Sequence, residues 1–538
     1  MAWHYRNWSR KENRTRTYYN KQPSKQQYFI FLKTLCNTNE IIKTNLNFIV
    51  KWEKRVNFMA EQAKKTNNIM YLHYAVVLLL CFGFKYLPPI GALTPLGMAI
   101  AGNFIGCIYG WSLVNMLWPS LVALLSMGLT IGMDTLVAQA FGNQTVMVLI
   151  FMTVVMAVTT ETGAMDWLVG KLLGAKFTAG KPWLTIWFLL LVAYVAGNFN
   201  SVIMALVMCT VLNSVFKQLG VEPYSKLPVL MFLGLAFCLM LGQVTFPFLG
   251  VGLVLVSAYS AMFQTALDFG QYIMFALPVG LTMTIVYTMI MRFVMRVDVT
   301  PFKNYDPSMT KVDGKGGKAT RDQKLALFFF FLYCLLVLFS SVRQFGILYA
   351  VCSKFGMYGL CTATIIIMTL LPKEDGSPLL EFNKLAKHMS WDIVVLTAFI
   401  MVLSTLMSSP DAGISATFNM LLQPLTQLSP YVFIVSILAF GCFVTNFANN
   451  LVLTILLMPM VVQFSAMVGM QPLGVICLLF FACQMALGTP GGSPVTAIMF
   501  AQSEWVKPGA MMKNAFIMLP MLFVAMVALG LGWASILF

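Results

Sequence analysis

The sequence predicts an all-α polytopic membrane protein, with about 11 transmembrane helices and two re-entrant hairpins in two inverted repeats. The 538 residues are 59% hydrophobic and 10% charged, whereas a soluble protein of this length needs about 25% charged residues to cover its surface. No Lys, Arg, Asp or Glu occurs in the 92 residues between Asp411 and Glu504. That stretch is long enough for several crossings of a hydrocarbon core about 30 Å thick. Most of the surface is therefore expected to face lipid.

Apolar runs bounded by charges, prolines and glycines give the predicted spans. Residues 71–295 are expected to form a first transmembrane helix and the first repeat, residues 296–325 a polar cytoplasmic linker, and residues 326–538 the second repeat. The spans predicted in the first part are 71–88, 92–113, 115–133, 142–164, 226–258 and 271–295. Those predicted in the second part are 326–345, 347–371, 391–412, 472–502 and 513–538.

Two further apolar segments, 182–216 and about 430–464, do not fit ordinary spans. The first has 35 uncharged residues, which would make one helix about 52 Å long or two arms of about 15 residues. Its centre, Gly-Asn-Phe-Asn at 197–200, is a poor sequence for a helix interior. The second has Thr-Asn-Phe-Ala-Asn-Asn at 445–450, so both centres share an Asn-Phe pair. Because broken backbone inside a bilayer must line a cavity or be buried in protein, both segments are predicted to be re-entrant hairpins.

The distribution of basic residues sets the predicted orientation. With the N-terminus in the cytoplasm, 32 of the 35 Lys and Arg residues fall on the cytoplasmic side, and only Lys85, Arg343 and Lys354 fall outside. This agrees with the positive-inside rule. Eleven crossings then place the C-terminus outside, and the second repeat starts on the opposite face from the first. The sequence therefore predicts a multi-pass protein of the inner or plasma membrane whose inverted repeats allow alternating access to a midplane site.

The most basic part of the chain is its first 70 residues, which hold 14 Lys and Arg against four Glu. The segment has no apolar core followed by a small-residue cleavage site, so it is not a signal peptide. We expect residues 1–70 to be a basic, disordered tail. Two interpretations stay open: the tail binds anionic lipid headgroups, or translation starts at Met59, directly before the first span, and the second is favoured. The confinement of this charge to one tail argues against nucleic acid as a partner.

Two of the predicted spans are interrupted by polar, glycine and proline residues. The first break is Gly-Gln-Val-Thr-Phe-Pro at 242–247, and the second is Gly-Thr-Pro-Gly-Gly-Ser-Pro-Val-Thr at 488–496. Neither sequence continues a helix. Unwinding frees carbonyl oxygens for a cation and turns the N–H groups of the restarting helix toward an anion. One such break could be a packing kink, but two breaks and two hairpin tips, paired across the repeats, favour a binding site.

The sequence contains few residues that could form a metal centre, a disulfide framework or an enzyme active site. The 11 cysteines are scattered without a CxxC pair, and the chain has only three histidines, so we expect no metal centre and no disulfide framework. No HExxH, GxSxG or paired-Asp motif occurs, and the chain is not expected to be an enzyme. Asn103 and Glu161 are weaker candidates at membrane depth, and Glu161 is interpreted as an interfacial residue because Asp166 and Lys171 follow closely.

Three stretches resemble the divalent anion:sodium symporter family, the citrate, dicarboxylate and sulfate carriers of the ion transporter superfamily. FGNQTVMVLIFMTVVMAVTTETGAMDWLVGKLL resembles the family's span before the first hairpin, DFGQYIMFALPVGL its sixth span, and FACQMALGTPGGSPVTAIMF its second broken helix. The family has Ser-Asn-Thr at each hairpin tip. Here the tips read Gly-Asn-Phe at 197–199 and Asn-Asn-Leu at 449–451, so the Asn is kept while the Ser and Thr are replaced.

The resemblance implies which residues bind the solute and the coupling ion. The substrate-binding residues implied at the tips and the second break are Asn198, Phe199, Ser201, Asn450, Leu451, Ser493, Pro494 and Thr496. The ion-binding residues implied there, with Na⁺ as the coupling ion, are Gly197, Asn198, Gly242, Thr245, Asn449, Asn450, Gly491 and Gly492. The resemblance also implies a homodimer and an elevator-like motion of the hairpin-bearing part.

The function predicted from the sequence is secondary active transport of a small anion, such as a carboxylate, coupled to sodium by alternating access. The alternative is a proton-coupled or uncoupled permease for a neutral or monoanionic solute, which Phe199 and Leu451 would suit. An intramembrane enzyme or a channel is a more distant alternative. Few acids or bases lie at membrane depth to serve an enzyme, and a channel needs a continuous pore, which the re-entrant tips could line.

Overall fold

The computed structural model describes residues 70–537 apart from 175, 264–266, 307–317, 408, 425–428 and 470. The predicted basic tail, the start at Met59 and the middle of the linker lie outside the described residues. From His73 to Phe538 the chain forms one compact unit. Within the described residues this unit is built from helices, and its β-structure is limited to one isolated bridge between Pro372 and Pro378. The predicted all-α class is confirmed.

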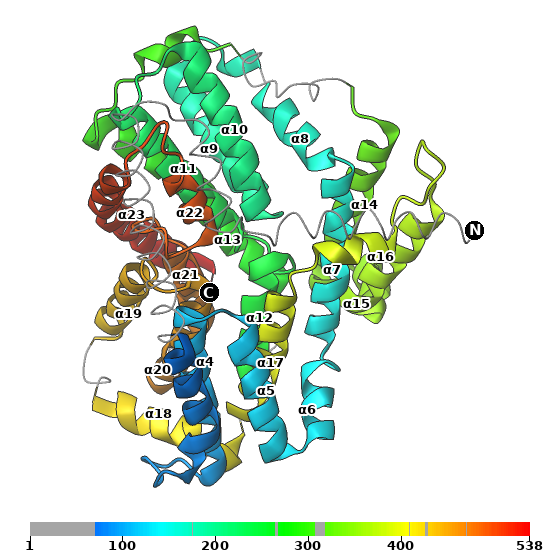
Figure 1. Cartoon of the computed structure of the whole chain (residues 1–538), viewed down its shortest axis with the longest axis vertical. Coiled ribbons are helices and arrows are strands. Elements are labelled where there is room, and N and C mark those ends of the chain that lie inside the picture. Colours follow the sequence, from blue (N-terminus) through cyan, green and yellow to red (C-terminus); the bar gives the residue numbers. More distant parts are fainter. Residues whose placement is uncertain are drawn as a thin grey trace, which may run out of the picture. The chain divides into compact units, whose positions relative to one another are not determined.

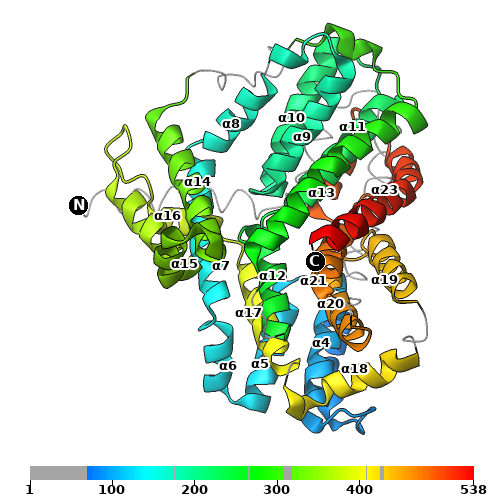
Figure 2. The same ribbon diagram turned by 180° about the vertical axis from the view of Figure 1, so that it is seen from behind.

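The helices of the first half follow one another with short connections (Figures 1 and 2). An apolar helix, Met70–Tyr86, contains a π-helical turn at Leu79–Gly83. The helices after it are α4 (Pro95–Leu113), α5 (Leu117–Ile131), α6 (Met133–Ala140), α7 (Gln144–Glu161), α8 (Ala164–Leu173), α9 (Pro182–Gly197), α10 (Ser201–Leu219), α11 (Lys226–Gly242), α12 (Gly250–Phe263) and α13 (Phe269–Met289).

The helices of the second half follow in a similar order, with the short helix α16 at the place that α6 has in the first half. Its helices are α14 (Arg321–Ser341), α15 (Ile347–Leu370), α16 (Phe382–Leu385), α17 (Trp391–Met407), α18 (Ile414–Leu422), α19 (Pro430–Val444), α20 (Asn450–Met467), α21 (Pro472–Cys483), α22 (Pro494–Phe500) and α23 (Pro508–Leu537).

Both predicted hairpins consist of two helices joined at the expected place. In the first, α9 ends at Gly197 and α10 begins at Ser201; in the second, α19 ends at Val444 and α20 begins at Asn450. The arms of each hairpin pack against each other. Proline starts the first arm in both cases, where its missing N–H has no helical partner to lose. Both predicted breaks also appear, because α11 stops at Gly242 and α21 at Cys483.

Two short helices before the hairpins were missed by the sequence prediction. The ranges 142–164 and 391–412 were predicted as simple spans, but each helix is followed by a glycine with a left-handed backbone, Gly163 (φ 66°) or Gly413 (φ 67°). The chain then turns into α8 or α18. A residue with a Cβ is strained in that conformation, and glycine is not. Each hairpin is therefore reached through a bend and a short helix.

The two halves pack reciprocally where the helices are broken. After the first break, α12 packs against α20, the second arm of the other half's hairpin. After the second break, α22 packs against α10, the corresponding arm of the first half. In each half, the helix that follows the break therefore packs against the hairpin of the opposite half.

The predicted linker is polar in composition, but its first part is packed against the protein. Its first part contains a short 3₁₀ turn, Thr300–Asn304, in which Phe302 is fully buried. The Phe302 ring lies 6.5 Å from that of Phe216 on α10, and Tyr305 donates a hydrogen bond to the Leu173 carbonyl (3.3 Å). The described start of the linker is therefore anchored beside the first hairpin.

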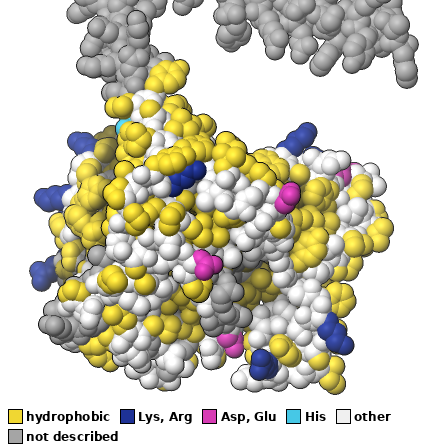
Figure 3. Space-filling model, turned by 90° about the horizontal axis from the view of Figure 1, so that it is seen from below, with side chains coloured by type: hydrophobic (Ala, Val, Ile, Leu, Met, Phe, Trp, Pro, Cys, Tyr) yellow, Lys and Arg dark blue, Asp and Glu magenta, His cyan; other side chains and the backbone are white. Residues whose placement is uncertain are grey.

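Length and composition identify eight described helices able to cross a membrane, or nine if the bent pair Phe382–His388 and Trp391–Met407 is one span. Two of the eight are α10 and α20, the second arms of the hairpins. The number of 11 spans and the inverted orientation of the repeats stay predictions. Hydrophobic side chains cover much of the face in Figure 3, where charged side chains are few and scattered. Such a surface fits a lipid environment.

Candidate functional site

The first hairpin tip is pressed against the end of α11. A Cβ on Gly197 would lie 2.1 Å from the Leu239 carbonyl oxygen, and one on Gly242 would lie 2.2 Å from the Tyr194 carbonyl oxygen. Only glycine permits such close contact between two backbones. The structure thus brings Gly197 and Gly242, both predicted ion-binding residues, together and gives each a packing role.

Asn198 presents an oxygen at this tip. Its Nδ2 donates to the carbonyl oxygens of Tyr194 (3.1 Å) and Val195 (3.2 Å). The opposite amide orientation would place Oδ1 against those two oxygens, so the hydrogen bonds fix the assignment. Oδ1 is buried and has no hydrogen-bond partner among the described residues. Asn198 therefore offers an unmet acceptor, which suits a cation or another hydrogen-bond donor.

Hydroxyl groups bind the carbonyls of the first break. Thr245 donates to the Tyr194 phenol oxygen (2.9 Å) or to the Leu241 carbonyl (3.1 Å), and the Tyr272 hydroxyl donates to the Val244 carbonyl. The Tyr194 phenol lies over α13, where a Cβ on Gly280 would come within 2.2 Å of its oxygen. Thr245 was predicted to belong to the site, whereas both tyrosines were missed. Their partners are 28 and 51 residues away, and no local pattern indicates such pairs.

The second tip contains a close counterpart of Asn198, and it is Asn446. Its Nδ2 donates to the Cys442 (2.8 Å) and Phe443 (3.2 Å) carbonyls, three and four residues back, as Asn198 does. The family-based comparison paired Asn198 with Asn450 and left Asn446 out of the site. The Asn-Phe pair shared by both tips was the signal for this residue. Unlike Asn198, Asn446 has its oxygen occupied, because Oδ1 accepts the Gly488 N–H at 2.6 Å.

Asn449 and Asn450 hold the start of α20. Asn449 Oδ1 accepts the N–H groups of Leu451 (3.0 Å) and Val452 (3.3 Å), and Asn450 Oδ1 also accepts that of Leu451 (2.9 Å). Asn450 Nδ2 donates to Gln484 Oε1 at 2.7 Å. The Leu451 side chain is buried in the core. Both asparagines therefore lie at the tip, as predicted, with their oxygens engaged in helix capping.

Hydroxyl groups make hydrogen bonds within the second break. Thr496 donates to the Ala486 carbonyl (2.6 Å), and Ser493 Oγ accepts the Val495 N–H (3.2 Å). A Cβ on Gly492 would lie 2.7 Å from the Thr445 carbonyl oxygen, whereas one on Gly491 would meet only the Thr489 hydroxyl at 3.7 Å. Gly492 is thus required for packing and Gly491 is not. The helix after the break, α22, has seven residues; its first residue, Pro494, has no N–H, and Ser493 accepts the Val495 N–H.

The remaining predicted residues are placed as follows. Phe199 packs on α14, with its ring 5.0 Å from that of Phe330 and 6.5 Å from that of Phe331. Ser201 is buried at the start of α10, and Pro494 is exposed at the start of α22. Phe199 therefore anchors the first tip to the second half.

The two broken helices contact each other, because α22 packs against α11. Thr496 in the second half lies 3.7 Å from Met240 Sδ, two residues before Gly242. Residues 182–216 and 412–503 contain no Lys, Arg, Asp or Glu. In the described part of the chain, no group of three or more His, Cys, Asp or Glu side chains is placed to hold a metal ion. Amides, hydroxyls and backbone groups thus supply the polar chemistry of the site.

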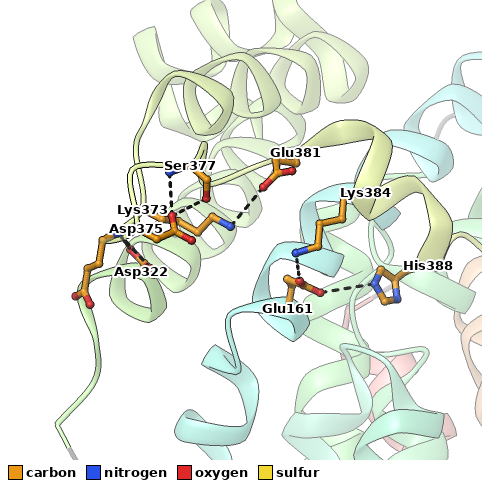
Figure 4. A network of polar contacts seen from close by, with 9 residues as sticks. Glu161, Asp322, Lys373, Asp375, Ser377, Glu381, Lys384 and His388 are labelled. Carbon is orange, nitrogen blue, oxygen red and sulfur yellow. Dashed lines mark hydrogen bonds and ion pairs between the residues drawn. The ribbon is translucent and has the colours of Figure 1, made fainter. Parts of the chain in front are cut away.

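Asn103 and Glu161 lie elsewhere. Asn103 is buried and donates to Ser126 Oγ (3.1 Å) and the Ala99 carbonyl (2.8 Å), which ties α4 to α5. Glu161, one third exposed at the end of α7, accepts from Lys384, and His388 Nε2 lies 3.8 Å away. Figure 4 shows both side chains pointing at Glu161 from the segment before α17. The hydrogen bond to Glu161 raises the pKa of Lys384. This surface ion pair fits the predicted interfacial position of Glu161.

The known proteins to which this chain is similar in sequence are transporters. A family model described as citrate transporter matches residues 104–360, a little under half of the chain. Na(+)/dicarboxylate cotransporter 3 of Rattus norvegicus is 22% identical over 31% of this chain and 27% of its own length. The sodium-dependent dicarboxylate transporter SdcS of Staphylococcus saprophyticus is 20% identical over 47% of this chain and 48% of its own length. The matched part thus spans between about a quarter and about half of these relatives.

Two solved structures share the fold. The YdaH transporter of Alcanivorax borkumensis aligns with a TM-score of 0.50 and 11% identity over 76% of this chain and 89% of that one. MtrF of Neisseria gonorrhoeae aligns with a TM-score of 0.51 and 13% identity over 76% of this chain and 83% of that one. At these identities the likeness concerns the fold alone. The resemblance predicted from the sequence is confirmed: this chain is similar to citrate and dicarboxylate transporters, and the proteins that it resembles are transporters rather than enzymes.

Proposed function

We propose that this protein is a secondary active transporter that carries a small carboxylate across the membrane, driven by sodium. The observation that carries the proposal is the pair of hairpin tips, each packed beside an unwound helix within a region that lacks charged side chains. Such a site binds a solute without burying a fixed charge, which a bilayer penalises. The similarity to citrate and sodium-dicarboxylate carriers supports a carboxylate as the solute and sodium as the driving ion.

The first tip is the proposed place for the cation. Asn198 Oδ1 is a buried oxygen without a donor among the described residues, and Na⁺ is bound by oxygen ligands. Carbonyls beside it in the first break accept hydrogen bonds from hydroxyls, and a carbonyl oxygen has a second lone pair available. Alternating access would use the bends at Gly163 and Gly413, which connect α7 and α17 to the helices leading into the hairpins.

Uptake into proteoliposomes tests this proposal. Purified full-length protein is reconstituted, and accumulation of radiolabelled succinate and citrate is followed with an inward sodium gradient, with potassium in its place, and with a proton gradient. Accumulation that requires sodium is the expected result. Equal accumulation in potassium would contradict sodium coupling and favour the second candidate.

The second candidate is a proton-coupled or uncoupled permease for a neutral or monoanionic solute. The absence of charged side chains from residues 182–216 and 412–503 favours it, because a dianion usually needs cationic or metal partners when it leaves water. Competition by neutral amides and monocarboxylates against succinate uptake separates the two candidates.

Orientation and assembly belong to the same proposal. The N-terminus is placed in the cytoplasm and the C-terminus outside, in a plasma or inner membrane, and the resemblance to the symporter family implies a homodimer. Impermeant labelling of cysteines introduced at Arg343 and Lys303 tests the orientation, since only the first should react from outside. Native mass measurement tests the dimer.

A further inference from the structure

Gln484 is a buried amide that the sequence analysis did not select. It is the first residue after α21, where its backbone N–H still donates to the Phe481 carbonyl (3.1 Å). Its side chain is fully buried (0% exposed). A polar side chain of this kind therefore lies inside the protein at the point where the second broken helix unwinds.

Two hydrogen bonds fix the orientation of this amide. Asn450 Oδ1 accepts the Leu451 N–H, so Asn450 Nδ2 is the atom that faces Gln484. Only an oxygen accepts that donor, so Gln484 Oε1 must point to Asn450 at 2.7 Å. Gln484 Nε2 then points away from Asn450, and it has no hydrogen-bond partner among the described residues.

The neighbouring polar groups show that this unmet donor is an exception. In the same tip, Asn446 Nδ2 is bound to two carbonyls, and the Thr445 hydroxyl donates to the Cys483 carbonyl at 2.6 Å. Thr496 and Ser493 are engaged as well. Leaving a buried donor without an acceptor destabilises a protein, and most buried donors are satisfied by protein, water or ligand. An acceptor from outside the chain is the natural partner of Nε2.

We propose that Gln484 determines specificity by donating from Nε2 to a carboxylate oxygen of the carried solute. This rests on the proposed function and adds the chemistry that the second tip contributes. The first tip and the second break then have opposite polarity, because Asn198 leaves an acceptor and Gln484, bound to Asn450 of the second tip, leaves a donor. A neutral amide also suits a carrier that must return without its solute, since a buried cation left unpaired during that step would be costly.

The Gln484→Glu variant tests this role, with succinate and citrate as probes. Glu keeps an oxygen for Asn450 and replaces the donor by a second acceptor. We expect at least tenfold weaker probe binding than wild type at pH 8. Relative to wild type at the same pH, binding should recover toward pH 5.5, because a protonated carboxyl donates again. The titratable groups on α21 and on the helices packed against it are Cys442, Cys477, Cys483, Tyr272, Tyr287, Tyr431 and Lys513, and the ordinary pKa of each of these residue types lies above pH 8.

The Gln463→Glu variant is the matched control, because it introduces the same change on α20, where Gln463 lies 3.4 Å from Ser415. It should bind both probes like wild type at every pH. Equal affinity of Gln484→Glu and wild type at pH 8, or a ratio that does not change with pH, would overturn the role of Gln484.

A second variant tests the same role if the first variant misfolds. If Gln484→Glu does not elute as a single species, Gln484→Met, similar in length but without a donor, should weaken succinate binding at least tenfold, and unchanged binding overturns the proposal. Wild type that binds succinate or citrate but does not transport them contradicts the proposed function alone. Wild type that binds neither contradicts both.

Discussion

The two hairpin tips share a local fold but differ in what they leave unpaired. Asn198 and Asn446 both donate from Nδ2 to the carbonyls three and four residues before them. The Asn446 oxygen is then used by the Gly488 N–H, while the Asn198 oxygen is not used by the described residues. Beside the second tip, at the end of α21, the unmet group is instead a donor, Gln484 Nε2.

This difference shows that two halves with a similar order of helices need not leave the same atoms unpaired. The backbone plan, a hairpin against a broken helix, is common to both halves, whereas side chains outside the tip decide which atoms remain free. A binding site with an unpaired acceptor on one side and an unpaired donor on the other suits two different ligands better than two identical ones.

The largest effects are expected from glycines at which the backbones touch. Gly197→Ala places a Cβ 2.1 Å from a backbone oxygen and Gly492→Ala one at 2.7 Å, so both should lower stability by about 1–3 kcal/mol, the first more than the second. Melting temperature in detergent is the measurement. Gly170→Ala, which would meet no atom within 4 Å on α8, serves as the control. Equal melting of all three variants would contradict the close packing of both tips.

The next largest effect is expected from substitution of Asn446, compared with the same substitution of Asn198. Asn446→Ala leaves the buried Gly488 N–H without its acceptor and should destabilise the protein by about 1–3 kcal/mol. Asn198→Ala loses the matching Nδ2 hydrogen bonds but leaves no backbone N–H without its acceptor, so it should lower the melting temperature less than Asn446→Ala and lose at least tenfold in succinate uptake. Uptake and thermal melting are measured on the same preparations. Identical profiles for the two variants would break the distinction between the tips.

A smaller effect is expected from the two tip phenylalanines. Phe199 packs on Phe330 and Phe331 of α14, while Phe447 is 59% exposed with Phe516 6.1 Å away. Phe199→Ala should lower stability by about 0.5–1.5 kcal/mol more than Phe447→Ala, the range typical of aromatic contacts. A larger loss for Phe447→Ala would show that the second tip is the more firmly docked one.

The smallest effect is expected far from both tips. Glu161 raises the pKa of Lys384, so the stabilisation from this pair is fully present below the unfolded Lys pKa and is lost only as pH rises through the folded value. Because this is a surface ion pair, Lys384→Met should change the melting temperature only slightly, and equally at pH 6 and pH 9. Melting curves at both pH values check this, and a change confined to pH 6 would point to His388 instead.

Much of this architecture could be predicted from local sequence. The length of 182–216 and its Asn-containing centre indicated a hairpin, and glycines with prolines at 488–496 indicated a break, because both signals act through backbone propensity. Gly163 and Gly413 were not selected, since a single glycine after an apolar run is also an ordinary helix end. Gln484 and Tyr272 could not be found in this way, because their roles depend on partners 34 and 28 residues away.

The reciprocal packing of the broken helices has a consequence for biosynthesis. Asn213 on α10 is bonded to Gln502, just after α22, and 289 residues separate the two. At a translation rate of about 5–20 residues per second, the earlier amide waits roughly 15–60 s for the later one. During that interval the first hairpin lacks its final neighbour, so the nascent chain must be sheltered by the insertion machinery until nearly its last helix has emerged.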